Sequence, residues 1–219
     1  MHVRVNAAMS VDGKLSTRRR EQLAISGPDD FERVEDLRES VDGILVGVGT
    51  VVADDPHLVL ERDRQRARRD RGEPPTPARI VADSLARMPP DARILDDAAP
   101  TYVLVGERAP NGRVSRLEKL GASVVRAGHA RVDLAEAFER LEADGVEEVL
   151  VEGGGEIIFS AFDADLVDEL SVYVGSTIVG GDDAPTLADG EGFVRDFPDL
   201  HLDDVERIDD GVLLSYSVE

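Results

Sequence analysis

Hydrophobic positions along the chain alternate between short apolar runs and segments with helical spacing. The first run, residues 3–9, ends at the turn-forming residues 10–13, which is typical of a strand. In residues 29–41, which follow Pro28, apolar side chains recur every three or four positions and predict an amphipathic helix. Residues 43–48 form a continuous apolar run, which indicates a strand buried on both faces of a parallel sheet.

The alternation continues through most of the chain. It predicts strands at residues 79–82, 101–105, 123–126 and 146–151, and helices at 114–120, 134–143 and 156–161. After Asp168 the apolar segments 170–174, 201–208 and 212–218 follow one another, and Asp209-Asp210-Gly211 between the last two is a hairpin signal. We therefore expect an α/β fold with a mostly parallel sheet, flanking helices and a C-terminal antiparallel hairpin.

Two segments lack a regular pattern. Residues 61–77 are rich in arginine and contain Pro74-Pro75, so we predict a solvated insertion loop there. An arginine run can also bind phosphate or nucleic acid, but acidic residues dilute this one and no aromatic residue is available for base stacking. Residues 180–193 are rich in Gly and Asp and predict a surface loop. Without a repeat or linker, we expect one domain over residues 1–219.

Charge narrows the class of protein. The 219 residues include 46 acidic and 25 basic ones, a net charge of −21, which argues against nonspecific nucleic-acid binding. The two lysines, Lys14 and Lys119, and the abundant carboxylates point to the salt-rich cytoplasm of a halophile; an ordinary acidic protein is the alternative. We predict no membrane span, because no apolar run is long enough.

Two kinds of catalytic or structural centre are not expected. Cysteine is absent, so the chain has no disulfide and no thiol nucleophile. The four histidines lie far apart without ligand spacing, so we expect no metal site.

The first candidate ligand motif runs from Val46 to Pro56. A strand ending in Gly47-x-Gly49 lets a ligand approach the backbone, and Thr50 could cap a short helix and offer its hydroxyl. The dinucleotide fingerprint of three glycines fails, because Val52 occupies the third position. Taken alone, the motif could also be a simple turn.

The second candidate is Glu152 followed by three glycines. A strand running into Gly153-Gly154-Gly155 and then a helix exposes backbone N–H groups at a helix N-terminus, which suits a pyrophosphate. Glu152 is better suited to accept hydrogen bonds from a polar substrate. A glycine-rich turn without a ligand is the alternative. A third segment, residues 6–14, brings polar side chains to the carboxyl end of the first strand, the usual ligand edge of such a sheet.

Together and in this order, several motifs resemble one enzyme family. They are Met9-Ser10-Val11-Asp12-Gly13-Lys14, Leu37-Arg38, Gly49-Thr50 with Asp54-Asp55-Pro56-x-Leu58, Arg79-Ile80-Val81-Ala82-Asp83-Ser84 and Val151-Glu152-Gly153-Gly154. The family is the riboflavin-pathway pyrimidine reductases, in the stand-alone archaeal and fungal form, and the resemblance covers essentially the whole chain. It implies a dihydrofolate-reductase-like fold, a homodimer and NADPH, with NADH possible, as hydride donor to C1 of the ribosylamino group of a phosphorylated pyrimidine.

The resemblance also assigns roles to residues. It implies cofactor contacts at Met9, Thr50, Asp54, Val81, Asp83, Ser84, Gly153, Gly154, Gly155, Glu156 and Ile157. It implies substrate contacts at Asn6, Arg38, Leu58 and Glu152, and the Arg38 fork suits a phosphate. We expect the nicotinamide C4 to face C1 of a ring-opened imine, with Asp54, Glu152 and Lys14 as the candidate catalytic groups. Ser84, Arg87 and Arg108 are candidates to contact the 2′-phosphate.

The chain departs from the bacterial members in two places. Asn6 stands where they have a lysine, which questions a lysine-assisted mechanism unless Lys14 substitutes. Glu61, followed by Arg62, stands where they have a phosphate-binding arginine. We expect no deaminase half like that of the bifunctional enzymes, because its zinc motif is absent from these residues. A true dihydrofolate reductase and a nucleotide-binding module without enzymatic activity remain the alternatives.

Overall fold

The computed structural model describes residues 1–21 and 23–219 and separates into two compact units. One unit contains Met1 and residues 35–150, and the other contains residues 2–34 and 151–219. Helix α1 (Pro28–Ser40) and strand β6 (Glu148–Gly153) each pass from one unit into the other. Each unit therefore has strands of its own, and the helix α1 and the strand β6 are divided between the two units. The single domain over residues 1–219 stays a prediction.

The unit formed mainly by residues 35–150 contains four parallel strands. They lie in the order β5-β4-β3-β2, with bounds Ser123–Arg126, Thr101–Val105, Ala78–Ala82 and Gly43–Gly47. Every residue of β2 and β3 is buried, as expected for parallel strands covered on both faces. The predictions for β4 and β5 are confirmed to the residue, and β2 and β3 each differ by one residue at one end.

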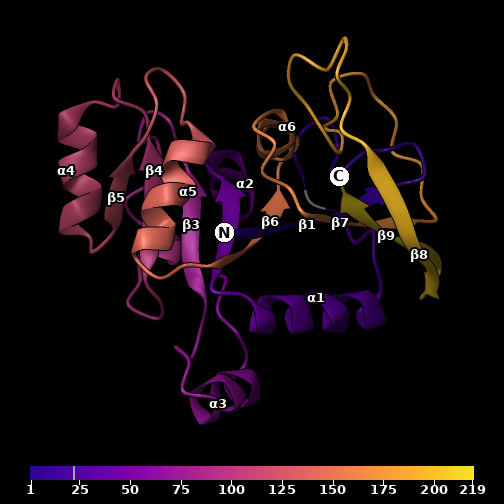
Figure 1. The fold of residues 1–219 in the computed structure, drawn as a ribbon, viewed down its shortest axis with the longest axis horizontal. Helices are drawn as coiled ribbons and strands as arrows, with labels where there is room; N and C mark the ends of the chain where they lie inside the picture. The colour runs from indigo at the N-terminus through magenta and orange to yellow at the C-terminus, as the bar shows by residue number, and fades with distance from the viewer. Residues whose placement is uncertain (22) are drawn as a thin grey trace. The chain divides into compact units, whose positions relative to one another are not determined.

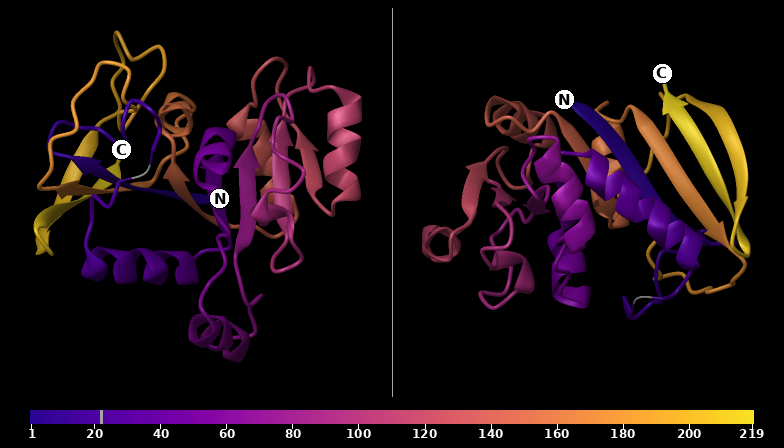
Figure 2. Two further views of the ribbon diagram at one scale, coloured as in Figure 1. Left: turned by 180° about the vertical axis from the view of Figure 1, so that it is seen from behind. Right: turned by 90° about the horizontal axis from the view of Figure 1, so that it is seen from below.

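Helices cover both faces of this part of the sheet. Val48 and Val51 of α2 (Val48–Asp54) and Val114 of α4 (Asn111–Lys119) belong to one buried cluster with the valines of β2, β3 and β4. Helix α5 (Leu134–Ala143) lies in front of the strands in Figure 1, whereas α2 is in front when the molecule is seen from behind in Figure 2. The helix predicted at 134–143 is confirmed, and α4 begins three residues earlier than predicted, directly after Pro110.

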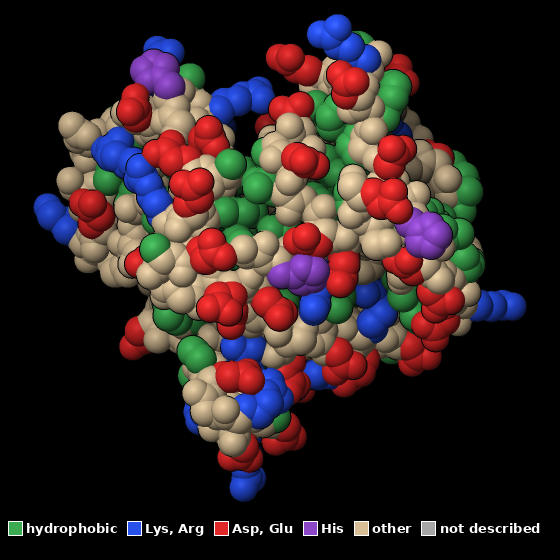
Figure 3. Space-filling view, viewed as in Figure 1, with side chains coloured by type: hydrophobic (Ala, Val, Ile, Leu, Met, Phe, Trp, Pro, Cys, Tyr) green, Lys and Arg blue, Asp and Glu red, His purple; other side chains and the backbone are tan. Residues whose placement is uncertain are grey.

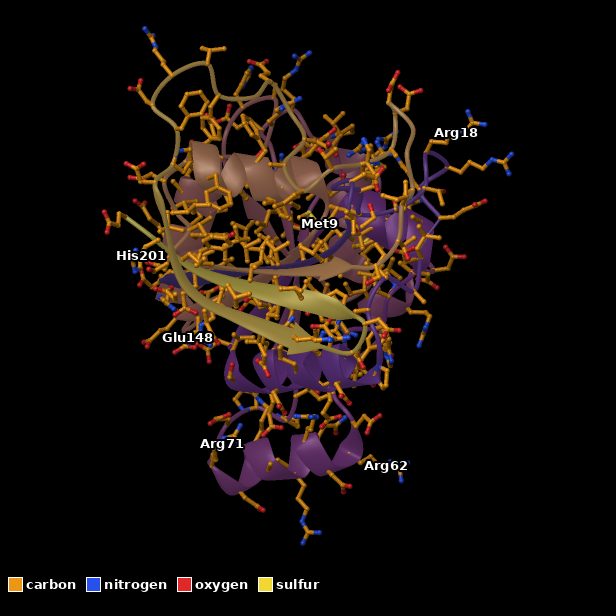
Figure 4. The ribbon with its side chains drawn as sticks, turned by 90° about the vertical axis from the view of Figure 1, so that its right-hand side faces the viewer. Met9, Arg18, Arg62, Arg71, Glu148 and His201 are labelled. Carbon is orange, nitrogen blue, oxygen red and sulfur yellow. The ribbon has the colours of Figure 1, made fainter. Side chains whose placement is uncertain are left out.

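The loop prediction for residues 61–77 is wrong for Arg62–Asp70, which forms helix α3. Arg68 explains the helix, because its guanidinium is buried and donates to three backbone carbonyls, those of Pro74 (2.8 Å), Val41 (2.8 Å) and Glu39. On the side of α3 that faces α1, Arg64 pairs with Asp36 and Glu39, 2.6 and 3.0 Å away. Arg62 and Arg71 mark the two ends of the helix in Figure 4. A 3₁₀ turn, Arg93–Leu95, follows β3.

The second unit contains the remaining strands. In it β1 (His2–Ser10) pairs parallel with β7 (Glu169–Gly175), and β7 pairs antiparallel with β9 (Gly211–Val218). Strand β8 (Leu200–Ile208) forms the outer strand of a hairpin with β9, which Figure 2 shows from below. The predicted C-terminal antiparallel hairpin is confirmed. Helix α6 (Gly155–Asp163) follows β6, and residues 180–193 form the predicted irregular loop.

The turn of the hairpin caps the start of α1. The Asp209 carboxylate accepts hydrogen bonds from the backbone N–H groups of Asp29 (3.4 Å) and Asp30 (3.1 Å). A Cβ on Gly27 would lie 2.5 Å from Cγ of Asp209, so only glycine permits this approach. Phe31, which we placed on the apolar stripe of the helix, is exposed instead. None of the helices among the described residues combines the length and apolar character needed to cross a bilayer.

Candidate functional site

The turn after β1 is held by the Asp12 carboxylate. It accepts hydrogen bonds from the Ser10 hydroxyl (2.7 Å) and from the backbone N–H groups of Val179 (3.0 Å) and Gly180 (2.7 Å). These bonds, the one from Ser10 first, lower the pKa of Asp12 to about 2. Gly13 takes a φ of +78°, which a tight turn of this kind requires. The turn is therefore fastened to the loop that follows β7.

Lys14 is part of the same junction. Its backbone forms an antiparallel bridge with Thr186, and its Nζ donates to the carbonyl of Ala184 at 3.3 Å. Met9, at the end of β1, is half-buried, and Figure 4 shows its position. Of the candidate catalytic groups, Lys14 is thus engaged by the loop over residues 180–193.

The three glycines form the junction that the sequence indicates. Gly153 ends β6 with a φ of +140°, and Gly154 is the N-cap residue of α6. Among the described residues, no acceptor binds the backbone N–H groups of Gly155 and Glu156. These two donors at the positive end of a helix can bind a phosphate group.

The loop over residues 180–193 packs against this junction. The Asp189 N–H donates to the Gly155 carbonyl at 3.0 Å, and Oδ1 of Asp189 accepts from the N–H (3.0 Å) and hydroxyl (2.6 Å) of Thr186. A Cβ on Gly155 would meet the Thr186 carbonyl and would lie 2.7 Å from Oδ2 of Asp189. The packing of this loop therefore requires glycine at position 155.

Helix α2 differs from the prediction. It begins at Val48 with Gly47 as its N-cap residue, and no side chain caps it, so the prediction that Thr50 caps the helix is wrong. Thr50 lies in the first turn and is half-buried, and Asp54 ends the helix on the surface. Desolvation by neighbouring atoms raises the pKa of Asp54 above its usual range, so its carboxyl keeps its proton to higher pH.

The segment after α2 has an unusual backbone. Asp55 and Leu58 have φ values of +41° and +50°, and the Leu58 side chain is buried in the core. Nε2 of His57 lies 2.6 Å from Oδ2 of Asp96, and Oδ1 of Asp96 accepts from Nη1 of the fully buried Arg79 at 2.7 Å. Desolvation opposes ionisation of Asp96, but the bonds from Arg79 and His57 outweigh it and lower its pKa to about 2.

Two candidates at the carboxyl end of β3, Val81 and Asp83, are buried. Val81 lies in the hydrophobic core, so only its backbone could touch a ligand. The Asp83 carboxylate accepts from the Met88 N–H (2.7 Å) and from Nε of Arg87 (3.3 Å). Ser84 is more accessible, and its hydroxyl oxygen accepts from the Val132 N–H at 3.1 Å.

Two further polar candidates lie on or beside α1. Arg38 is half-buried and pairs with Glu35 through Nη1 at 2.6 Å. Asn6 on β1 is buried, and its Oδ1 accepts from Nη2 of Arg33 at 2.7 Å. Glu152 is half-buried on β6.

Sequence reasoning missed Arg33, His57 and Asp189. Arg33 donates to the candidate Asn6, His57 binds Asp96, and Asp189 lies at the glycine junction. No local pattern marks them, although the position of His57 inside the Asp54-to-Leu58 motif is a signal. The part of the chain that the structure describes contains no group of three or more acidic or histidine side chains placed to hold a metal ion. Acidic side chains are spread over the face shown in Figure 3.

Comparisons with known proteins agree with one another. A family model described as the RibD C-terminal domain matches residues 1–214. The 2,5-diamino-6-ribosylamino-4(3H)-pyrimidinone 5′-phosphate reductase of Archaeoglobus fulgidus is 43% identical over 211 residues, 96% of this chain and 94% of the relative. The protein of the same name from Methanothermobacter thermautotrophicus is 42% identical over 220 residues, 100% and 98% of the two chains.

The fold has close counterparts among solved structures. A pyrimidine reductase-like protein from Corynebacterium diphtheriae has a TM-score of 0.85 at 20% identity, covering 100% of this chain and 92% of the other. An Acinetobacter baumannii RibD structure has a TM-score of 0.78 at 21% identity, covering 100% of this chain and 58% of the other. The dihydrofolate-reductase-like α/β fold predicted from the sequence is confirmed.

Proposed function

The chain belongs to the RibD C-terminal domain family, and on this premise we propose that it reduces the ribosyl group of 2,5-diamino-6-ribosylamino-4(3H)-pyrimidinone 5′-phosphate to the ribitylamino product with NADPH as the donor. It is an oxidoreductase of riboflavin biosynthesis, because some of its relatives are named reductases and others are named riboflavin biosynthesis protein RibD. The substrate class follows from those names, whereas the choice of NADPH is our own inference.

The observation that carries the cofactor proposal is the pair of backbone donors at the start of α6. The N–H groups of Gly155 and Glu156 have no acceptor among the described residues, and Gly153 and Gly154 leave the approach free of side chains. An anionic pyrophosphate suits such a position. Further cofactor contacts are proposed at Met9, Thr50, Asp54, Ser84 and Ile157, and through the backbone at Val81 and Asp83.

NADPH, when bound, supplies the hydride that reduces C1 of the substrate. The chain's own residues bind the substrate and move protons, and we propose contacts from Asn6, Arg38, Leu58 and Glu152. Opening of the ribose ring requires a proton at the sugar oxygen. The raised pKa of Asp54 supports it as the proton donor, whereas Lys14 is engaged with the Ala184 carbonyl.

We further propose that Ser84, Arg87 and Arg108 favour NADPH over NADH by contacting the 2′-phosphate. The loops after β3, β4 and β5 are held together by hydrogen bonds from Gly106 N–H to the Ser84 carbonyl and from Arg108 N–H to the His129 carbonyl, each 3.1 Å long. Arg87 and Arg108 are exposed on these loops. Their side chains can therefore reach a phosphate without rearrangement of the core.

The experiment measures the oxidation of NADPH by its absorbance, with the ribosylaminopyrimidine phosphate as substrate. The assay contains molar KCl, because a net charge of −21 requires screening. We expect turnover with this substrate and none with dihydrofolate. Turnover of dihydrofolate instead would favour a dihydrofolate reductase, and NADPH binding without turnover of either would favour a nucleotide-binding module. If the wild type prefers NADPH over NADH and the Arg108→Ala variant does not, the result supports contact between Arg108 and the 2′-phosphate.

We also propose a homodimer. Apolar residues of β8 stand opposite apolar residues of β9 in the pairs Leu200↔Val218, Leu202↔Tyr216 and Val205↔Leu214, and the β8 members are exposed. An exposed apolar face on such an acidic chain is typical of an interface. Light scattering should give twice the chain mass, and Val205→Asp should give the monomer. The cytoplasmic location stays a prediction.

A further inference from the structure

A buried polar cluster joins the candidate residue Asn6 on β1 to two residues of α1, Asp30 and Arg33, that no motif indicated. Asn6 is only 7% exposed, and its Oδ1 lies 2.7 Å from Nη2 of Arg33. Nε of Arg33 donates to Oδ1 of Asp30 at 2.9 Å, and Asp30 is 1% exposed. The guanidinium is therefore held between a buried carboxylate and a buried amide.

The contact with Arg33 determines which way the Asn6 amide points. A guanidinium donates hydrogen bonds and accepts none, so the atom of Asn6 that faces it must be the oxygen. The amide nitrogen then points away from Arg33 with both of its N–H groups. Within residues 1–21 and 23–219, this nitrogen has no acceptor.

A second hydrogen-bonding group lies beside the Asn6 amide. Ser171 on β7 is the register partner of Asn6, and paired residues on neighbouring parallel strands project from the same face of a sheet, about 5 Å apart. Ser171 is half-buried, and its hydroxyl has no hydrogen-bond partner in the described part of the chain. Two unused donors therefore stand side by side.

We propose that Arg33 is a positioning residue that orients Asn6 so that its amide nitrogen, together with the Ser171 hydroxyl, donates to an acceptor oxygen of the substrate. The inference rests on the proposed function, in which Asn6 contacts the phosphorylated pyrimidine. The substrate offers such oxygens on its phosphate and on its ribosyl and pyrimidinone groups. Arg33 acts through Asn6 and does not itself take part in the reaction.

The test compares the KM for the substrate among variants that keep or remove one part of this arrangement. Asn6→Asp keeps the acceptor for Arg33 but loses both donors, and should raise KM about tenfold or more while the Kd for NADPH changes less than about twofold. The double variant Asp30→Asn/Arg33→Met removes the orienting guanidinium without leaving an unpaired buried carboxylate, and should raise KM about threefold to tenfold. Arg33→Lys, which retains a donor, should fall between it and the wild type.

Ser171 has a matched control on the next strand. Ser215 is the register partner of Ser171 on β9 and is also half-buried. We expect Ser171→Ala to raise KM and Ser215→Ala to leave it unchanged. Inhibition by inorganic phosphate, used as a competitive inhibitor, then identifies which substrate oxygen accepts the hydrogen bonds. Weaker inhibition of Asn6→Asp than of the wild type assigns the contact to the phosphate group. Unchanged inhibition assigns it to the ribosyl or pyrimidinone group.

One result would overturn the proposal. If the Asp30→Asn/Arg33→Met double variant lowers the melting temperature but leaves KM at the wild-type value, Arg33 only supports the fold. A failure of the proposed function looks different, because the wild-type chain itself would then neither bind NADPH nor turn over the pyrimidine.

Discussion

Two loops of the molecule are each fastened by one carboxylate, and they differ in what binds that carboxylate. Asp12 holds the turn after β1 through neutral donors, a hydroxyl and two backbone N–H groups. Asp96 holds the segment after α2 through the ring of His57, and the guanidinium of Arg79 on β3 binds the other oxygen of the same carboxylate. In both cases the pKa of the carboxyl falls to about 2.

The difference shows two ways to fix a loop in a very acidic protein. Neutral donors add no charge, so the hydrogen bonds of the Asp12 junction should depend little on salt concentration. The Asp96 junction depends on Arg79, whose side chain is fully buried and therefore poorly screened. Its segment has two residues with positive φ, Asp55 and Leu58, and each such conformation costs about 1–3 kcal/mol.

The largest effect should come from removing the buried cation. Arg79→Met removes the buried cation beside Asp96 and the hydrogen bonds that it donates to the Ala99 carbonyl and the Thr101 hydroxyl, and should lower the free energy of unfolding by about 3 kcal/mol. Urea unfolding at a constant KCl concentration measures this change in the free energy of unfolding. Arg195→Met is the control, because Arg195 and its partner Asp196 are both exposed, and it should change stability by less than about 0.5 kcal/mol. Equal losses in both variants would show that burial does not distinguish the two arginines.

Removal of the charge at the other junction should act locally. Asp12→Asn replaces an ionised acceptor by an amide, so we expect hydrogen exchange at the Val179 and Gly180 amides to rise about tenfold. Mass spectrometry of the peptides that cover residues 176–181 measures it. Asp182→Asn is the control, since Asp182 is an exposed carboxylate of the same loop. Unchanged exchange in Asp12→Asn would mean that the loop is held by other contacts.

Acid should weaken both junctions in the same interval of pH. The folded pKa of each carboxyl is about 2 against an ordinary value of 3.8, so its contribution to stability is present above pH 3.8 and is lost as pH falls toward 2. Circular dichroism between pH 5 and pH 2 should therefore show a steeper loss of stability in the wild type than in Asp12→Asn or Asp96→Asn. Parallel curves would contradict the lowered pKa values.

The smallest effect should come from His57. Its pair with Asp96 is partly exposed, so His57→Ala should cost less than about 1 kcal/mol in the urea experiment. His129→Ala removes a more exposed histidine–carboxylate pair and should be close to neutral. If His57→Ala lowered the free energy of unfolding as much as Arg79→Met does, the ring of His57 would be as important to stability as the buried arginine.

Strands were the most predictable part of the fold, because burial on both faces leaves a continuous apolar run in the sequence. The run at 101–105 matches β4 to the residue. Helix α3 was not predictable, because it has no apolar periodicity. Its stability comes from Arg68, which reaches carbonyls in a segment more than 25 residues earlier in the chain. Composition alone cannot tell a buried arginine from a solvated one.

The candidate site was predictable as motifs but not as contacts. The glycine junction after β6 lies where the sequence indicates, because glycine and helix-start signals are local. The partners of Asp12 are 167 and 168 residues away, and the role of Gly155 depends on a loop that begins at residue 180. Such pairings depend on topology, which residue patterns constrain only loosely.

The cap on α1 has a consequence for the order of folding. Asp209 is separated from the N–H groups that it binds by 179 and 180 residues. While the chain is being synthesised, the first turn of this helix therefore exists without its carboxylate partner until residue 209 has left the ribosome. Since long-range contacts of this kind slow folding, we expect the amino-terminal end of α1 to become protected only when the last two strands have paired.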